Sequence, residues 1–348
     1  MRRVLRHEDL LGRAEEKLKF LSHFADKYIE DMKLIIERSS APENPYICRL
    51  SGQAKRPPLT RPSCAQIPRP VLESLSRIRG DHYLFGGAVR DSIAGRPPRD
   101  YDFVARVNQE CLETAGGTRL GNMKDAVEFN SGRFQVHVAP FAEGMTVAEE
   151  LAEGRSGSIT MDVMAMNPKT GELIDPCRGL GDFKAGVVRV VDNHELKTNP
   201  QLAFRAFRLA VKYGAGVELT TFETIRDSLV VYARAMQEMR ERWRIVRMLA
   251  QGLSNGSPLQ SLEWWRLSGV MELVIPELHY LSEENRRQYN DALLSCENAP
   301  LRKRLSALLE FLDEKDRETI AKRLKSDLNG YHRIEGRDLQ VVASITAA

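Results

Sequence analysis

The feature that most constrains the fold of this chain is the stretch YLFGGAVRDSIAGRPPRDYDFVAR, residues 83–106. A short apolar segment runs into Gly86 and Gly87, a segment of helical character follows, and a second apolar segment begins near residue 100. Glycine allows positive φ angles and lets the backbone approach a ligand closely. The stretch therefore predicts a strand, a tight turn, a short helix and a second strand.

Two carboxylates open the second predicted strand. Asp100 and Asp102 flank Tyr101, and side chains at positions i and i+2 of a strand point to the same face. Carboxylates placed in this way repel one another unless a cation lies between them. A hard divalent ion such as Mg²⁺ suits oxygen ligands and accepts phosphate oxygens in its remaining positions. Two such ions can activate an attacking hydroxyl and stabilise a leaving pyrophosphate.

The glycine turn carries a second part of the signal. A helix that starts after Gly86 and Gly87 offers free N–H groups that favour phosphate. Arg90 can add a charge-assisted fork to a triphosphate, and Asp91 can hold Arg90 or the loop in place. A Gly-Gly pair or an Asp-x-Asp by itself is common in ordinary surface turns, so the prediction depends on their combination and order.

The remainder of the chain of 348 residues divides by pattern. Residues 1–38 have helical spacing that extends to Ile35, and residues 39–70 are rich in proline and serine without a period. Residues 71–194 alternate short strands and helices, which predicts an α+β domain with a mixed sheet, and helical patterns dominate from 195 onward. The segments DAVEF and FQVHVAPF are expected to pair across a turn, and TMDVMAMNP is expected to be another strand.

Composition excludes several classes. Hydrophobic residues make up 42% and charged residues 28%, and no apolar run is long enough for a membrane span. The N-terminus lacks an apolar signal-peptide core, so a cytoplasmic location without a membrane partner is expected. The five cysteines form no CxxC pair, which argues against zinc and disulfide frameworks. The net charge of +3 implies that any basic surface is local.

The motifs together resemble the class II tRNA nucleotidyltransferases and the bacterial poly(A) polymerases. FGGAVRDSIAGRPPRDYDFVA is similar to the head motif of that family, and ITMDVMAMNPKTGELIDPCRGLGDFKAGVVRVV (159–191) to its second sheet segment. NPQLAFRAFRLAVKYG (199–214) resembles the neck helix, and ERWRIVRMLAQGL and LEWWRLSGVMELVIPEL resemble the body. The resemblance covers about residues 80–280, and it implies a head at 71–194, a neck and body at 195–280 and a short helical tail at 281–348. Residues 1–70 would be a helical extension and linker.

The resemblance implies a reaction in which an RNA 3′-hydroxyl attacks the α-phosphate of a nucleoside triphosphate, with ATP favoured. Asp100 and Asp102 would be catalytic and would bind two Mg²⁺ ions. A further set of residues would bind the nucleotide: Gly86, Gly87, Arg90, Asp91, Asn199, Arg205 and Arg208.

Several positions depart from the family pattern. The family's Arg-Arg-Asp is replaced by GRSGS, with only Arg155 nearby, and Asp162 stands where asparagine is usual. In the neck helix, Asn199 and Leu202 stand in for the aspartate and arginine that select the base. Asn199 can still hydrogen-bond a base, whereas Leu202 cannot.

The strand FQVHVAPF departs as well, because His137 and Ala142 stand where the family often has an acidic residue and an arginine. His137 is either an ordinary sheet residue or lies near the metals, in place of an oxygen ligand that Mg²⁺ would prefer.

Three hypotheses for function stay open. The first is an active transferase on RNA 3′ ends with unusual or relaxed nucleotide choice, which acts on a tRNA 3′ end, the favoured case, or adds poly(A). The second is an RNA-binding protein whose transferase fold no longer catalyses. The third is a transferase that acts on a protein or small-molecule acceptor.

The expected RNA surface is basic and helical. It comprises Arg240, Arg242, Arg244, Arg247, Arg302, Lys303, Arg304, Lys322, Arg323, Lys325, Arg333 and Arg337. Trp264 and Trp265 are adjacent, so one is expected in the core, and the other packs between helices or stacks on a base.

Overall fold

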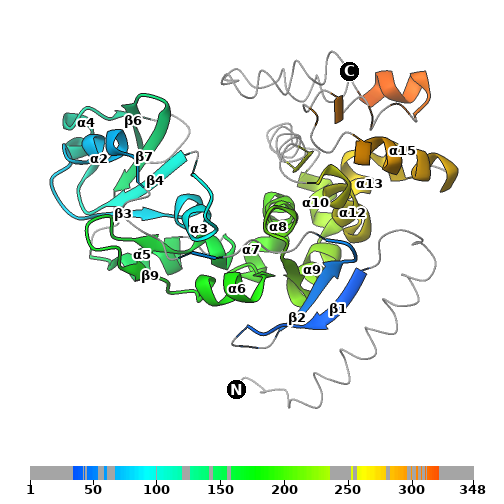
Figure 1. Ribbon diagram of the computed structural model, residues 1–348, viewed down its shortest axis with the longest axis horizontal. Helices are drawn as coiled ribbons and strands as arrows, with labels where there is room; N and C mark the ends of the chain where they lie inside the picture. Colours follow the sequence, from blue (N-terminus) through cyan, green and yellow to red (C-terminus); the bar gives the residue numbers. More distant parts are fainter. Residues whose placement is uncertain are drawn as a thin grey trace.

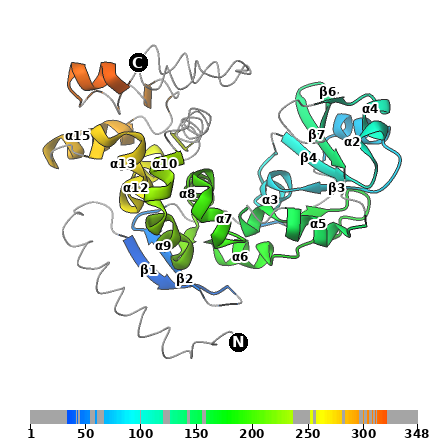
Figure 2. The same ribbon diagram turned by 180° about the vertical axis from the view of Figure 1, so that it is seen from behind.

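The computed structural model describes residues 34–41, 43, 45–53, 59–60, 67–98, 100–119, 126–140, 144–154, 158–235, 252–253, 257–279, 283–295, 299, 303–304, 307, 310 and 312–320. Figure 1 shows a head built around a sheet, joined by α8 and its neighbours to a largely helical part. Figure 2 shows the same division from behind. The α+β head followed by helices, as predicted from the sequence, is therefore confirmed.

The head contains a seven-stranded sheet in the order β5-β6-β7-β4-β3-β8-β9. Its central pair, β4 and β7, is parallel, whereas every other neighbouring pair in this sheet is antiparallel. The strands are β3 (His82–Phe85), β4 (Asp100–Ala105), β5 (Thr118–Arg119), β6 (Val127–Ser131), β7 (Phe134–Pro140), β8 (Ala165–Met166) and β9 (Leu173–Ile174). The predicted strands before and after the double glycine and the β6–β7 hairpin are confirmed.

Side chains alternate across this sheet, because successive residues of a strand face opposite sides. One face is apolar: Tyr101 and Phe103 of β4 are in register with Val136 and Val138 of β7, and all four are buried. The other face carries Phe85 and Ala165, and α5 packs against these two residues. The head helices are α2 (Arg69–Leu75), α3 (Gly87–Ile93), α4 (Gln109–Thr114) and α5 (Val147–Gly154).

The segment TMDVMAMNP is only partly a strand, which corrects the expectation. Thr160–Asp162 form a short 3-10 helix, η2, and only Ala165–Met166 join the sheet as β8. The Thr160 hydroxyl donates to the Asp182 carboxylate (2.8 Å), and Asp162 is ion-paired. An isolated antiparallel bridge between Ile159 and Val190 adds backbone hydrogen bonds to these side-chain contacts.

A second sheet corrects the reading of the N-terminal segment. Its four strands have the order β1-β2-β11-β10, with bounds β1 (Leu34–Arg38), β2 (Tyr46–Leu50), β11 (Gly216–Glu218) and β10 (Val187–Val188). Residues 34–38 were expected in a helix and 46–50 in an irregular linker, so both expectations are wrong. The helix predicted for residues 1–33 lies outside the described residues.

Pairing with a distant strand explains this difference. Val217 of β11 pairs with Cys48 of β2, and Ile47, Cys48 and Leu50 are buried. A Cβ at Gly216 would lie 2.9 Å from the Cys48 carbonyl oxygen, so glycine permits the close approach of the two strands.

Helices form most of the described chain after the head, and β11 is the exception among the described residues. The helix at 199–214 is confirmed as α8, with Pro200 in its first turn and Gly214 left-handed (φ 59°) at its C-cap. The bounds are α6 (Gly179–Ala185), α7 (Asn193–Thr198), α8 (Pro200–Tyr213), α9 (Leu219–Asp227), α10 (Leu229–Ala235), α12 (Pro258–Ser268), α13 (Val270–Val274), α14 (Pro276–His279) and α15 (Glu283–Ser295). None of the described helices has the length and apolarity that a bilayer crossing requires.

Both adjacent tryptophans of α12 are buried, so packing between helices is confirmed for the second ring, and the alternative of stacking on a base is wrong. Trp264 stacks on Phe207 at a centroid distance of 5.4 Å, and Trp265 makes an edge contact with Phe204 at 5.7 Å. A Cβ at Gly252 would meet the Trp265 ring at 2.7 Å, which shows how tightly the second ring is covered. Packing on two sides of α12 therefore accommodates both rings.

We expect Trp264→Ala to lower the free energy of unfolding by about 3–5 kcal/mol, because a large buried ring is lost and a cavity is left. Denaturant unfolding followed by circular dichroism measures the change. Val230→Ala, at a position that is 68% exposed, is the control and should be near neutral. A loss below about 1 kcal/mol for Trp264→Ala would contradict this packing.

Candidate metal and nucleotide site

Asp100 and Asp102 lie on the polar face of β4, opposite the buried Tyr101 and Phe103. Both are partly exposed, and 37% of the Asp102 side chain is accessible. Hard oxygen donors on an open sheet face fit a divalent cation that takes its remaining ligands from phosphate. Within the described residues, no three or more His, Cys, Asp or Glu side chains are grouped so as to hold a metal by themselves.

His137 lies beside this pair. Its strand, β7, runs next to β4 with His137 in register with Asp102, and His137 Nδ1 is 3.0 Å from Asp102 Oδ1. Glu128 of β6 is the register partner on the other side, with Oε1 4.0 Å from His137 Nε2. The hydrogen bond to Asp102 raises the pKa of His137 above its ordinary value, although burial opposes this. Of the two roles left open by the sequence, the geometry favours the one near the carboxylates.

The double glycine forms the turn between β3 and α3. Gly86 is the N-cap residue with φ 70° and ψ −130°, a conformation that favours glycine, and its N–H donates to the Met164 carbonyl (3.0 Å). A Cβ at Gly87 would lie 3.4 Å from the Arg90 guanidinium. The turn therefore brings α3 close to β4 and to the segment before β8.

Arg90 is buried within the protein. Its Nε donates to the Tyr213 hydroxyl (2.8 Å), and its guanidinium forms an ion pair with Asp162. The Asp91 carboxylate lies 3.6 Å away. These contacts join α3 to η2 and α8, and the direct contact of Arg90 with a triphosphate stays a prediction.

Asp91 fastens α3 to the end of α8. Lys212 Nζ lies 2.8 and 3.0 Å from the two Asp91 oxygens, and the Tyr213 hydroxyl also donates to Asp91. Burial alone would raise the pKa of Asp91. The charges of Arg90 and Lys212, together with the hydrogen bonds from Lys212 and Tyr213, hold this pKa below its ordinary value. Burial and the nearby Arg90 lower the pKa of Lys212 to about 8 against the opposing pull of Asp91, so the ion pair is present at neutral pH.

Asp162 is the second buried carboxylate of this junction. Arg205 Nη2 lies 2.7 Å from Asp162 Oδ2, so Asp162 contacts Arg90 from the head and Arg205 from α8. Although 36% of the Arg205 side chain is exposed, partial removal from water, followed by repulsion from Arg90, lowers its pKa to about 10. Burial and the neighbouring Arg205 lower that of Arg208 to about 10 as well. The sequence flagged Asp162 as unusual without assigning it a partner, because its partners come from distant segments.

The start of α8 contains Asn199 and Leu202, the two positions at which the resemblance predicts base selection. Asn199 is the N-cap residue, and its side-chain oxygen accepts a hydrogen bond from the Gln201 N–H (3.1 Å). Leu202 is buried in the core. Contact of Asn199 with a base stays a prediction, because its observed oxygen contact is the helix cap.

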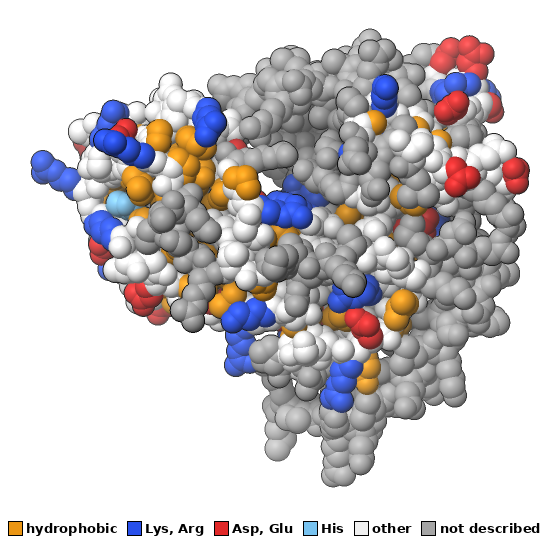
Figure 3. All heavy atoms as spheres, in the orientation of Figure 1, with side chains coloured by type: hydrophobic (Ala, Val, Ile, Leu, Met, Phe, Trp, Pro, Cys, Tyr) orange, Lys and Arg blue, Asp and Glu red, His pale blue; other side chains and the backbone are white. Residues whose placement is uncertain are grey.

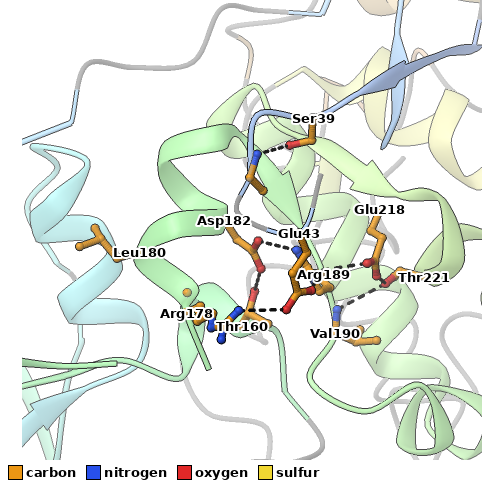
Figure 4. A network of polar contacts seen from close by, with 12 residues as sticks. Ser39, Glu43, Thr160, Arg178, Leu180, Asp182, Arg189, Val190, Glu218 and Thr221 are labelled. Carbon is orange, nitrogen blue, oxygen red and sulfur yellow. Dashed lines mark hydrogen bonds and ion pairs between the residues drawn. The ribbon is translucent and has the colours of Figure 1, made fainter. Parts of the chain in front are cut away.

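A separate polar network lies where η2, α6, β10 and the β1–β2 loop meet (Figure 4). Arg189 Nη2 lies 2.8 Å from Asp182 Oδ1, and Arg189 Nε lies 3.6 Å from Glu218 Oε1. Glu43 from the β1–β2 loop pairs with Arg189 and with Arg178 (3.3 Å). These ion pairs therefore connect the loop of the β1–β2 hairpin to residues next to α6 and β10.

The remaining site expectations fall mostly outside the described residues. These are Arg155, Ala142, Arg240, Arg242, Arg244, Arg247, Arg302, Lys322, Arg323, Lys325, Arg333 and Arg337. Lys303 is exposed, as expected. Arg304 is buried and donates to the Leu253 carbonyl, so its expected place on an RNA surface is wrong.

We expect Asp162→Ala to lower the free energy of unfolding by about 3 kcal/mol or more, because it removes the carboxylate between Arg90 and Arg205 and leaves the buried Arg90 with Asp91 alone as its acidic neighbour. Urea unfolding at neutral pH measures the loss. Asp162→Asn, which keeps hydrogen-bond acceptance, should lose less, and Asp81→Ala at an exposed position is the control. A loss below about 1 kcal/mol for Asp162→Ala would show that the pairs contribute little.

The sequence of this chain is similar to those of a CCA-adding enzyme and a multifunctional CCA protein. No family model matches the chain. It is 28% identical over 229 residues to a CCA-adding enzyme of Lactiplantibacillus plantarum, covering 60% of this chain and 56% of that protein. It is 24% identical over 218 residues to a multifunctional CCA protein of Nitrosomonas europaea, covering 57% and 50%. The chain thus spans about half the length of the curated relatives it matches.

Solved structures give the same result at the level of the fold. A Thermotoga maritima CCA-adding enzyme complexed with tRNA superposes with a TM-score of 0.60 at 22% identity, covering 79% of this chain and 70% of that one. A CCA-adding enzyme in complex with CTP gives 0.57 at 22% identity, covering 76% and 70%. The chain therefore has the fold of the CCA-adding enzymes, and its predicted resemblance to the class II tRNA nucleotidyltransferases is confirmed.

Proposed function

We propose that the chain is a metal-dependent nucleotidyltransferase that adds nucleotides from a nucleoside triphosphate to the 3′-hydroxyl of an RNA, with the 3′ end of a tRNA as the favoured acceptor. The observation that carries this proposal is the pair Asp100 and Asp102 on the open face of β4, next to the Gly86–Gly87 turn, in a fold shared with CCA-adding enzymes.

The donor set of the pair fits Mg²⁺. Asp100 and Asp102 are the residues that would hold the ion. When bound, Mg²⁺ supplies activation of the attacking hydroxyl and stabilises the charge on the leaving pyrophosphate.

The junction beside the metal face has the charge needed for a triphosphate. Four cationic groups and two carboxylates come together there: Arg90, Arg205, Arg208, Lys212, Asp91 and Asp162. Two positive charges are therefore in excess, in partly buried surroundings where they are screened little by salt. Figure 3 shows blue Lys and Arg side chains at the junction of the head with the helical part. Arg205 keeps 36% of its side chain exposed, whereas Arg90 is buried, so Arg205 is better placed than Arg90 to meet phosphate directly.

Selection of the base is expected to be relaxed. Leu202 belongs to the core and the Asn199 oxygen caps α8, so neither provides the paired donors and acceptors that read a base edge. ATP stays the favoured substrate, with CTP as the competing one. Structurally similar CCA-adding enzymes have been solved in complex with CTP and in complex with ATP.

The alternatives differ in their acceptor or in whether they catalyse. Poly(A) addition would use the same metal face. An inactive RNA-binding protein would not need two carboxylates that repel one another, and a transferase for a protein or small molecule would need another acceptor surface. The acceptor is therefore the part of the proposal that an assay must decide.

We expect Asp100→Asn and Asp102→Asn each to reduce nucleotide transfer by about 10³-fold or more, because each removes a metal ligand and several kcal/mol of transition-state stabilisation. The protein is incubated with Mg²⁺, each labelled triphosphate in turn, and total tRNA. Asp81→Asn, an exposed head residue away from the pair, is the matched control and should retain activity.

The position of the label separates the hypotheses. Label on tRNA that disappears in both variants supports the proposal, and long adenylate tails on any RNA would indicate poly(A) addition. Label on protein would redirect the acceptor. Tight RNA binding without any label would contradict the proposed catalysis.

A further inference from the structure

His137 connects the carboxylate pair to a third strand. Asp102, His137 and Glu128 occupy matching register positions on β4, β7 and β6, so their side chains lie on the same face of the sheet. His137 Nδ1 is 3.0 Å from Asp102 Oδ1, and Nε2 is 4.0 Å from Glu128 Oε1. The imidazole therefore lies between two carboxylates, one of which belongs to the proposed metal site.

The direction of the hydrogen bond follows from the chemistry of its partners. An ionised carboxylate can only accept, so the Nδ1–H of His137 donates to Asp102. The bond engages Oδ1 and leaves the second oxygen, Oδ2, for a cation. The side chain of His137 is only 21% exposed, so strand pairing and its neighbours restrict the ring.

A partly exposed aspartate samples several rotamers, and a donor fixed on the neighbouring strand selects among them. Ligating carboxylates are commonly held in this way by partners outside the metal's own ligand set, and the loss of such a partner typically costs about 10–100-fold in metal affinity or activity. The register of β4 with β7 places the imidazole of His137 beside the Asp102 carboxylate.

We propose that His137 is a positioning residue that orients the Asp102 carboxylate for the divalent cation, and that Glu128 restrains the imidazole from the far side. This inference rests on the proposed function, because it assumes that Asp102 is a metal ligand. It assigns no metal bond and no proton transfer to His137. The positioning role requires only that residue 137 donate an N–H group to the Asp102 carboxylate.

The test uses Mn²⁺ as the probe, with binding to the full chain followed by electron paramagnetic resonance. His137→Leu removes the donor, and we expect it to weaken Mn²⁺ binding about 10–100-fold. His137→Asn offers an amide N–H near the position of Nδ1, and we expect it to restore binding to within about threefold of the wild type. Thermal unfolding of both variants checks that the sheet is intact, and Asp100→Asn confirms that the signal reports this site.

The concentration of metal needed for half-maximal transfer is a second readout. It should rise in His137→Leu more than kcat falls, and it should recover in His137→Asn. Equal Mn²⁺ affinity in His137→Leu and the wild type would overturn the inference, as would an asparagine variant as weak as the leucine variant. Absence of any Mn²⁺ binding by the wild type would overturn it too.

Failure of the proposed function gives a different pattern. A wild type that binds Mn²⁺ through Asp100, and loses affinity in His137→Leu, but transfers no nucleotide to RNA, would contradict the proposed function alone. The positioning role would then stand on the binding data.

Discussion

Two buried carboxylates at the junction of α3 and α8 hold the functional part of this molecule together. Asp91 pairs with Lys212 and Tyr213 at the end of α8, and Asp162 pairs with Arg90 and Arg205. A charge withdrawn from water is tolerated only when it is paired, so these groups specify one another's positions. Because α3 directly precedes β4 in the chain, fixing α3 against the neck also fixes where the Asp100–Asp102 face lies (Figure 1).

The same junction bears on the proposed choice of nucleotide, because α8 begins at Asn199 and contains Leu202. Asp162 engages Arg90 and Arg205, and Leu202 faces the core. On the proposed function, the start of α8 therefore offers fewer polar groups for a base edge, while Asp162 holds the head against α8. The two carboxylates of the proposed metal site do not depend on Asn199 or Leu202, since the alternation of β4 presents both of them on one face.

Much of the head could be predicted from the sequence because its signals are local. The strand before Gly86, the α3 helix and β4 follow each other within about two dozen residues, and the two ends of α8 are indicated by Pro200 in its first turn and Gly214 at its C-cap. The β1–β2 hairpin could not be predicted, because β2 forms a strand by pairing with β11, which is far along the chain. The burial of Trp265 and Arg304 is likewise set by segments that pack on them from elsewhere, not by their own neighbours in the sequence.

The carboxylate pair was predicted from its spacing, and the contact of His137 with it was only one of two open readings. Which strand lies beside β4 depends on sheet topology, and the parallel β4–β7 pairing that brings His137 to Asp102 has no signature in either strand. Once the pairing is known, period-two alternation places Glu128 on the same face.

The central claim is that Asp100 and Asp102 bind a divalent cation together with a triphosphate. The most direct measurement is an anomalous difference map from a crystal of the full chain grown with Mn²⁺ and a non-hydrolysable ATP analogue. We expect an anomalous peak in contact with both carboxylates and with phosphate oxygens of the analogue. A peak elsewhere, or an ordered triphosphate without metal beside these two residues, would contradict it.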